Sequence, residues 1–185
     1  MTRPRPRIFL LFKPRGALCS TVEERGAHTV FGLLAEPYRA WSMVGRLDKD
    51  SEGVLLFADD SRWAQRLMDP GSLAKTYVVV VEGFPREETL EFMRAGGHVL
   101  DGRALRPVEV TRLGKAPRGG TRFRVTLHEG VNRQIRRLFL AAGYKVRRLT
   151  RSSVGPVTLG EMSPGDGREL GPEEVDQLVH SLPNA

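Results

Sequence analysis

Short apolar runs separated by turn residues predict that this chain of 185 residues builds several buried strands. Residues 8–12 and 53–58 are continuous apolar runs bounded by Pro, Gly or charged residues, which is typical of core strands. Lys75–Glu82 is a β-branched run that suits a central strand, and residues 38–44 form a further predicted strand. These runs predict the strands on which the rest of the chain packs.

Helical periodicity marks several of the intervening segments. Apolar side chains recur every three or four residues from 131 to 142, and Gly143 ends this predicted helix. Asp60 or Ser61 is placed to cap another helix, which ends before residue 69. Shorter helices are predicted for three further segments, residues 29–34, 86–94 and 172–182.

Alternation of apolar and polar residues predicts the remaining strands. Residues 107–113 and 122–128 alternate, and the second segment has one apolar and one basic face. A mobile basic hairpin loop, 115–120, joins them, and two more strands are expected at 145–150 and 155–159. Because strands and helices do not alternate regularly, the predicted fold class is α+β with a largely antiparallel or mixed sheet.

The net charge of +7 is concentrated in one segment. Between Val131 and Arg151 lie seven cations and no acid, and the other 22 basic residues balance the 22 acids. Such a segment predicts a surface that contacts nucleic-acid phosphates, whereas a merely solvated helix face would normally carry acids as well. On the predicted helix, Arg133, Arg136 and Arg137 are three or four residues apart and share a face.

Composition argues against several other classes of protein. The chain has one cysteine, Cys19, and four scattered histidines, so neither a disulfide nor a metal site is expected. No apolar stretch reaches membrane-spanning length, and the one near the N-terminus is too short for a signal peptide. We expect a cytoplasmic protein without a cofactor, with a flexible basic arm at residues 1–7 and a single domain at 8–185.

Residues 45–52 combine three acids and two bases immediately before an apolar run. This density of charge argues against a buried strand and predicts a loop at the mouth of one. A carboxylate in such a loop is held by a rigid scaffold yet reached by a substrate, which favours a catalytic role for Asp48. A solvated turn with surface ion pairs is the alternative interpretation.

Three blocks of sequence resemble those of a known family. They are Gly-Arg-Leu-Asp-Lys-Asp-Ser-Glu-Gly at 45–53, Lys-Thr-Tyr-Val-Val at 75–79 and Glu-Gly-Val-Asn-Arg-Gln-Ile-Arg-Arg-Leu at 129–138. In order and content they resemble motifs of the RsuA/RluB/RluE/RluF family of ribosomal RNA pseudouridine synthases. The resemblance implies the pseudouridine synthase fold, a bent mixed sheet with flanking helices and an active-site cleft across its middle.

The same resemblance implies roles for the site residues. Asp48 takes the place of the family's essential aspartate, and Arg136 is the cation that keeps it ionised. Tyr77 stacks on the target base, and Ile135 walls the pocket. The implied reaction converts uridine to pseudouridine in ribosomal RNA without a cofactor and requires the base to be flipped out. Attack of Asp48 on C1′ and abstraction of a sugar proton are both open at this point.

Further basic residues are expected to bind the RNA backbone. The chain is most similar to short RluE-type members without an N-terminal S4 RNA-binding domain, which implies 23S rRNA as substrate, and a monomer is expected. Gly167 stands where the family's closing turn has tryptophan, so looser local packing is expected there. The expected RNA contacts are Lys13, Arg15, Arg46, Arg133, Arg137, Arg147 and Arg148.

Two other functions are considered. A catalytically silent RNA-binding or ribosome-assembly factor of the same fold would have no chemical reason to retain Asp48, Tyr77 and Arg136. A glycoside hydrolase using Asp48 with Asp50 or Glu52 would have no use for the basic segment. The RNA-modifying enzyme is therefore the preferred hypothesis.

Overall fold

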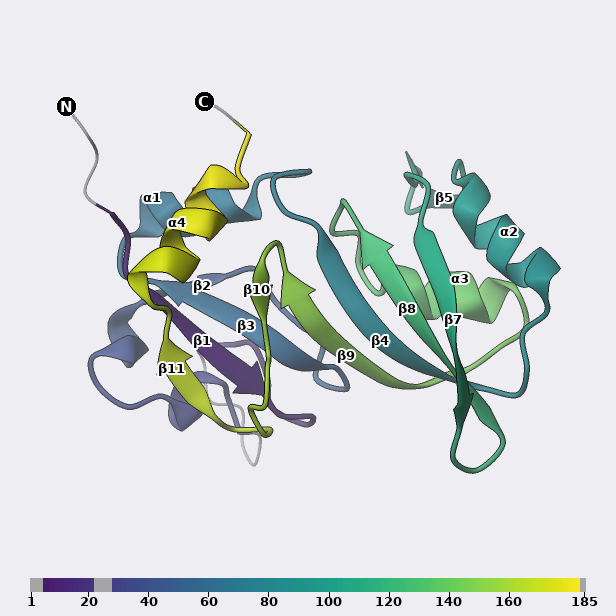
Figure 1. Ribbon diagram of the computed structural model, residues 1–185, viewed down its shortest axis with the longest axis horizontal. Helices are drawn as coiled ribbons and strands as arrows, with labels where there is room; N and C mark the ends of the chain where they lie inside the picture. The colour runs from purple at the N-terminus through teal and green to yellow at the C-terminus, as the bar shows by residue number, and fades with distance from the viewer. Residues whose placement is uncertain (1–4, 22–27, 184–185) are drawn as a thin grey trace. The chain divides into compact units, whose positions relative to one another are not determined.

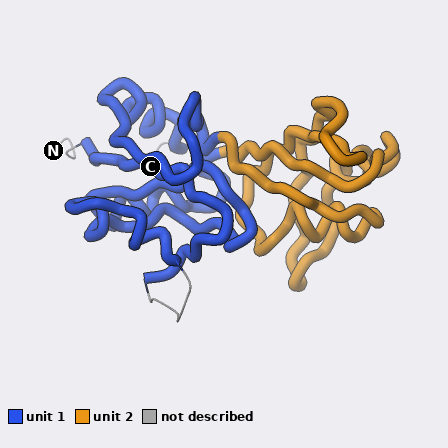
Figure 2. Tube along the Cα trace, turned by 90° about the horizontal axis from the view of Figure 1, so that it is seen from below, with its two compact units in different colours: residues 1–73, 153–185 blue, residues 74–152 orange. Residues whose placement is uncertain are grey.

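The computed structural model describes residues 5–21 and 28–183. The chain divides into two compact units (Figure 2). Unit 1 comprises residues 1–73 and 153–185, and unit 2 comprises residues 74–152. None of the helices in the described ranges is long and apolar enough to cross a membrane.

The centre of unit 1 is a sheet built around its first strand. β1, Ile8–Lys13, lies between β3, Glu52–Ala58, and β11, Gly167–Glu169. Both pairings are antiparallel. β2, Ser42–Val44, also pairs antiparallel with β3. β2, which directly precedes β3 in the chain, therefore lies beside it in the sheet.

Every residue of β1 and β3 is buried because both faces of this sheet are covered. Alternate side chains of a strand point to opposite faces. One face packs against helices α1, Ser61–Met68, and α4, Pro172–His180 (Figure 1). The other face packs against residues of two 3-10 helices, η1, Phe31–Leu33, and η2, Tyr38–Ala40.

Unit 2 contains a second set of strands in the order β9-β4-β8-β7. β8 pairs antiparallel with both β4 and β7. Helix α3, Gln134–Ala141, covers one face of these strands, where the ring of Phe139 lies 5.6 Å from that of Phe123 on β8. The strands are β4, Lys75–Glu82, β7, Glu109–Ala116, β8, Gly120–Leu127, and β9, Val146–Val154.

Smaller elements complete the two units. α2, Glu87–Ala95, packs beside β7. A separate hairpin in unit 2 joins β5, Val99–Leu100, to β6, Arg103–Ala104, through Asp101 and a glycine that both have positive φ. β10, Val157–Thr158, pairs antiparallel with the end of β9.

The predicted α+β class with a mostly antiparallel sheet is confirmed. The strand predicted at 38–44 is wrong in its first half, because η2 forms there and places the Tyr38 ring against Phe9, with centroids 4.0 Å apart. The helix predicted at 29–34 is reduced to η1. Aromatic packing, which local periodicity does not report, determines the structure of this segment.

The predicted helix of the basic segment begins later than its apolar stripe suggests. Arg133 has a φ of 50° and adopts the left-handed conformation, so α3 begins at Gln134. Arg133 is therefore not on a helical face with Arg136 and Arg137, which corrects the prediction. The helix ends as predicted, with Gly143 at a φ of 85° just after it.

Two predictions concern the packing around β1. Of the predicted basic arm, residues 1–4 lie outside the described residues, and Arg5 forms an ion pair with Asp176 at 2.7 Å. A β-carbon at Gly167 would collide with the ring of Phe9. The space beside Gly167 is therefore filled by Phe9, and the looser packing expected there is not observed.

Candidate active site

Asp48 lies in the loop that connects β2 to β3 in unit 1. Its carbonyl oxygen accepts a hydrogen bond from the Ser51 amide at 3.0 Å, which closes a four-residue turn. The loop is anchored on both sides of Asp48. The Leu47 amide donates to Sγ of Cys19 at 3.4 Å, and the Lys49 carbonyl accepts from the Gly16 amide at 2.8 Å. We call residues 48–51 the Asp48 turn.

Lys13, at the end of β1, donates hydrogen bonds to the backbone of the Asp48 turn. Its side chain is fully buried, and Nζ donates to the carbonyl oxygens of Ser51 at 2.8 Å and Pro14 at 3.1 Å. The Lys49 carbonyl lies 3.5 Å from the same nitrogen. Burial lowers the pKa of Lys13, and the charges of Cys19 and Asp48, among others nearby, oppose this shift.

This environment corrects the expectation that Lys13 contacts RNA. A fully buried ammonium whose protons point at backbone carbonyls is not presented to a phosphate. Its hydrogen bond to Ser51 instead joins the end of β1 to a residue 38 positions away in sequence. Lys13 is therefore a positioning residue for the loop that carries Asp48.

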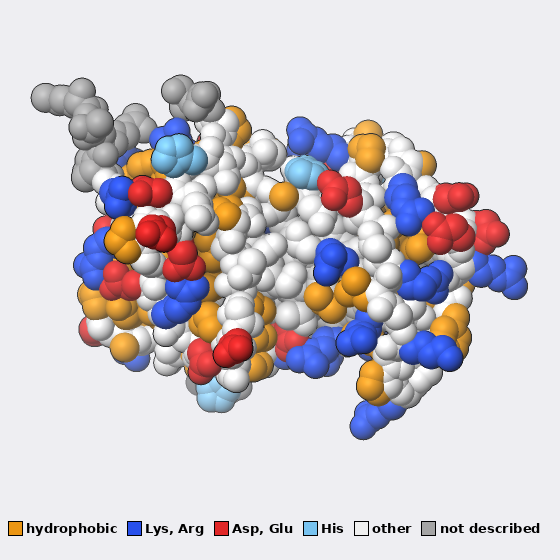
Figure 3. All heavy atoms as spheres, in the orientation of Figure 1, with side chains coloured by type: hydrophobic (Ala, Val, Ile, Leu, Met, Phe, Trp, Pro, Cys, Tyr) orange, Lys and Arg blue, Asp and Glu red, His pale blue; other side chains and the backbone are white. Residues whose placement is uncertain are grey.

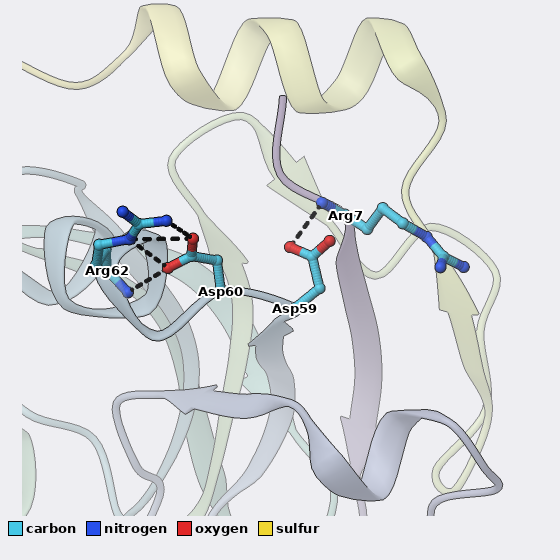
Figure 4. Close-up of polar contacts among 4 residues, drawn as sticks. All are labelled: Arg7, Asp59, Asp60 and Arg62. Carbon is cyan, nitrogen blue, oxygen red and sulfur yellow. Dashed lines mark hydrogen bonds and ion pairs between the residues drawn. The ribbon is translucent and has the colours of Figure 1, made fainter. Parts of the chain in front are cut away.

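The acids at the other end of β3 have structural roles (Figure 4). Asp59 accepts a hydrogen bond from the Arg7 amide at 3.0 Å. Asp60 is the N-cap of α1, accepting from the Arg62 amide at 2.8 Å and forming an ion pair with the Arg62 side chain at 2.6 Å. These hydrogen bonds to Arg62 lower the pKa of Asp60 to about 2.

Tyr77 and Ile135 contribute to the core of unit 2. Tyr77 lies opposite Val125 in the β4–β8 pairing, and its side chain is buried with 9% of its surface exposed. Ile135, in the first turn of α3, is also buried. Tyr77 therefore lies on the face of the sheet that α3 covers, and Ile135 lies on that helix.

Arg136 lies in the same helical turn as Ile135. Its Nη1 donates to the Val146 carbonyl at 3.2 Å, which ties the start of α3 to the start of β9. This bond leaves the guanidinium half-buried, a setting in which its charge acts on neighbours with little screening. The predicted approach of Arg136 to Asp48 stays a prediction.

Two buried polar residues were not predicted as part of the site. Glu129 accepts hydrogen bonds from Nε2 of Gln134 at 2.7 Å and from the Arg106 amide at 2.9 Å, and both Glu129 and Gln134 are buried. They fix the first residue of α3 and with it the position of Arg136 two residues later. The sequence signal for them is their place in the block 129–138 that resembles a motif of the family.

Two predicted RNA contacts have protein partners instead. Arg137 forms a two-pronged ion pair with Asp101, at 2.6 and 3.0 Å, which raises the pKa of Arg137 and lowers that of Asp101. Arg147 donates to the carbonyls of Pro117 and Arg118 at 2.9 and 3.0 Å, at the tip of the β7–β8 hairpin. Neither guanidinium is fully presented to solvent, which weakens their candidacy as primary phosphate contacts.

The structure thus sorts the predicted site residues by unit. Asp48, Lys13, Arg15 and Arg46 belong to unit 1, and the remaining ones belong to unit 2. Arg15, Arg46, Arg133 and Arg148 are exposed, and their contact with RNA stays a prediction. No group of three or more His, Cys, Asp or Glu side chains within the described ranges is placed to hold a metal ion.

Comparison with known proteins identifies the family to which the chain is similar. The sequence model of the RNA pseudouridylate synthase family matches residues 7–141, a range that includes Asp48, Tyr77 and Arg136. The chain is 36% identical over 179 residues to ribosomal large subunit pseudouridine synthase B of Bacillus subtilis, covering 95% of this chain and 72% of the relative. It is 35% identical over 178 residues to ribosomal small subunit pseudouridine synthase A of Escherichia coli, covering 94% and 74%.

Solved structures show the same fold. A crystal structure of a pseudouridylate synthase superimposes with a TM-score of 0.83 at 28% identity, covering 94% of this chain and 74% of that one. The archaeal box H/ACA sRNP Nop10–Cbf5 complex matches with a TM-score of 0.59 at 23% identity over 86% of this chain and 53% of that one, which supports the fold alone. Fold and comparisons together define an isomerase that acts on RNA. The chain belongs to the RNA pseudouridylate synthase family.

Proposed function

We propose that this enzyme converts a uridine of ribosomal RNA, specifically of 23S rRNA, to pseudouridine, acting as a monomer without a cofactor. The observation that carries the proposal is the Asp48 turn, a carboxylate loop anchored from beneath by a buried lysine. It lies within the range matched by the family. The named relatives modify the large and the small ribosomal subunit, which supports ribosomal RNA as the substrate class.

The chemistry required fits the residues present. The N1–C1′ bond breaks, the uracil turns, C5 joins C1′, the C5 proton leaves, and N1 gains a proton. Asp48 is the ionised carboxylate that acts at the sugar, and Arg136 is the cation that favours its ionised form. Tyr77 supplies the face on which the detached base stacks. The protein atoms return to their starting state, as an isomerisation demands.

A uridine stacked in RNA does not reach such a residue, so the base must be flipped out. The exposed arginines are the groups that grip the phosphates while this happens. Arg15 and Arg46 do so beside the Asp48 turn in unit 1, and Arg133 and Arg148 do so in unit 2.

The test is release of tritium from uracil C5 in unmodified transcripts of 23S and 16S rRNA. Wild type is expected to release tritium from the 23S transcript, and Asp48→Asn is expected to release none. Asp50→Asn is the matched control, since it removes an exposed acid from the same turn and should stay active. Release from the 16S transcript alone would contradict the 23S assignment, and full activity of Asp48→Asn would contradict the role of Asp48.

The alternative is a silent RNA-binding factor of the same fold. It predicts salt-sensitive binding of rRNA by wild type with no tritium release from naked transcript or from ribosomal subunit precursors. Asp48→Asn would then bind rRNA as tightly as wild type does, and neither protein would release tritium.

A further inference from the structure

The positive charge of the chain is a property of unit 2 as a whole. Unit 2 has 17 basic and 7 acidic residues, whereas unit 1 has 12 basic and 15 acidic residues. The excess is therefore not confined to residues 131–151, and cations from the β7–β8 hairpin contribute to it. The proposed catalysis assigns no role to these cations.

Two of them lie side by side on the face of the sheet that α3 does not cover. On β8, Phe123 and Val125 are buried toward α3, whereas Arg122 and Arg124 alternate with them and are exposed. Strand geometry separates such i and i+2 residues by about 7 Å. We call the face that carries Arg122 and Arg124 the outer face of unit 2.

The cross-strand pairs define the rest of the outer face. Arg122 lies opposite Val80 and Arg124 opposite Val78 on β4, and on the β7 side Arg124 lies opposite Thr111. On β4, Tyr77 lies between Thr76 and Val78, whose side chains belong to the outer face. The side chain of Tyr77 points to the opposite face, which α3 covers. The outer face is therefore opposite the face on which we place the target base.

The two arginines have no structural partner that would explain them. Within the described ranges, neither side chain has a hydrogen bond or an ion pair, in contrast to Arg94, which pairs with Glu87, and Arg137, which pairs with Asp101. Two exposed guanidinium groups about 7 Å apart on one strand repel each other, and within the described ranges no acid is paired with either of them. Such a pair without a structural role is a candidate for contact with an anionic partner.

The surroundings extend this positive surface toward the hairpin tip. Arg118 is exposed there, and a β-carbon at Gly120 would meet the Arg147 guanidinium, so Arg147 reaches the same end of the face. The acids on the outer face lie at its ends, where Glu82 is opposite Gly120 and Glu109 contacts His128.

The space-filling view agrees with this arrangement. In the orientation of Figure 1, α3 lies behind β8 and β7, so the face toward the viewer is the outer face. Lys and Arg side chains gather over these strands in Figure 3, with small apolar patches between them and acidic side chains toward the margins. Apolar and threonine side chains between cations suit a sugar–phosphate chain better than they suit a bound ion.

We propose that the outer face of unit 2 is a second RNA-binding surface, at which Arg122 and Arg124 contact phosphates of the rRNA outside the nucleotide being modified. The inference rests on the proposed function for the identity of the RNA. Charge complementarity selects the partner, because two adjacent unneutralised guanidinium groups on an open sheet face match a polyanionic backbone. Its contribution to binding is independent of the base sequence.

The test is the salt dependence of binding to a 23S rRNA transcript. In Arg122→Gln/Arg124→Gln, the slope of log K against log[salt] should fall in magnitude by about 1.4–1.8, and affinity near 0.1 M salt should fall up to roughly 60-fold. The matched control is Arg86→Gln/Arg103→Gln, which removes the same charge from exposed residues of unit 2 that lie outside the outer face. This control should bind as wild type does.

The charge-preserving variant Arg122→Lys/Arg124→Lys should restore most of the slope. Equal slopes for wild type and the glutamine variant would overturn the proposal, as would an equal loss in the Arg86/Arg103 control. Each variant must show the circular dichroism spectrum and the urea unfolding midpoint of wild type. The lysine variant distinguishes an effect of the lost charge on binding from an effect on folding. Tritium release by wild type is measured independently, so failure of the proposed function and failure of the outer face are distinguished.

Discussion

Replacing Lys13 by methionine tests how the Asp48 turn is held. Methionine keeps much of the apolar stem and removes the ammonium, so the carbonyls of Ser51 and Pro14 lose their donor. Each hydrogen bond from a charged group contributes about 1.5–3 kcal/mol to the free energy of unfolding. Part of their loss is offset, because the variant no longer pays the desolvation cost of a buried charge. We expect a net decrease of about 2 kcal/mol in the free energy of unfolding.

Catalysis should suffer more than stability does. A displacement of about 1 Å in a catalytic group lowers rate by roughly 100-fold, and the turn that carries Asp48 loses its main anchor in this variant. We expect kcat for tritium release to fall by roughly 10- to 100-fold at a temperature where the variant is fully folded. KM for the transcript should change little, because the ammonium is buried and does not face solvent.

Urea unfolding and single-turnover tritium release measure the two effects separately. Lys49→Met is the matched control, since it removes an exposed lysine from the same turn and should leave both unfolding free energy and kcat near those of wild type. A Lys13→Met variant with unchanged stability and kcat but a raised KM would refute this reasoning. It would restore the interpretation of Lys13 as a phosphate contact.

Two further predictions concern stability. Because the pKa of Asp60 is about 2 in the folded protein and its ordinary value is 3.8, the stabilisation by its ionised form is complete above about pH 4 and is lost as pH falls toward 2. The difference in Tm between wild type and Asp60→Ala should therefore narrow across this range, and a constant difference would contradict the cap. Gly120→Ala would place a β-carbon 2.8 Å from the Val81 carbonyl oxygen, so we expect a loss of about 1–3 kcal/mol in urea unfolding. Gly130→Ala, whose β-carbon meets nothing within 4 Å, should be near neutral, and equal effects of the two would contradict the collision.

Much of the fold follows from local patterns in the sequence. The apolar runs, the alternation on β8 and the Asp60 cap were predicted because side-chain periodicity and capping act within a few residues. The late start of α3 was not predicted, because the left-handed conformation of Arg133 is sterically uncommon for a residue with a β-carbon. The buried hydrogen bond between Glu129 and Gln134, which spans this position, is a further contact that side-chain periodicity does not report.

Asp48 was also accessible to sequence reasoning, because a carboxylate before a buried run is a local feature, whereas the roles of Tyr77 and Arg136 were predicted from the resemblance to the family's motifs. Their supporting contacts were not. Lys13 looked like a surface cation after an apolar run, and its burial results from its position opposite Gly53, where β1 meets the start of β3. A charge that reads as solvent-exposed in sequence becomes an internal anchor once carbonyls of a distant turn surround it.

The sequence by itself determined the class of fold, the order of most elements, the loop that carries Asp48 and the likeness to a family of RNA-modifying enzymes. Only the tertiary structure decided which cations are anchors, which are ion-paired and which face solvent. Lys13, Arg137 and Arg122 illustrate these three outcomes. The physical reason is that the environment of a charge is set by strand pairing and burial among residues far apart in the chain, which a local pattern of residue types does not encode.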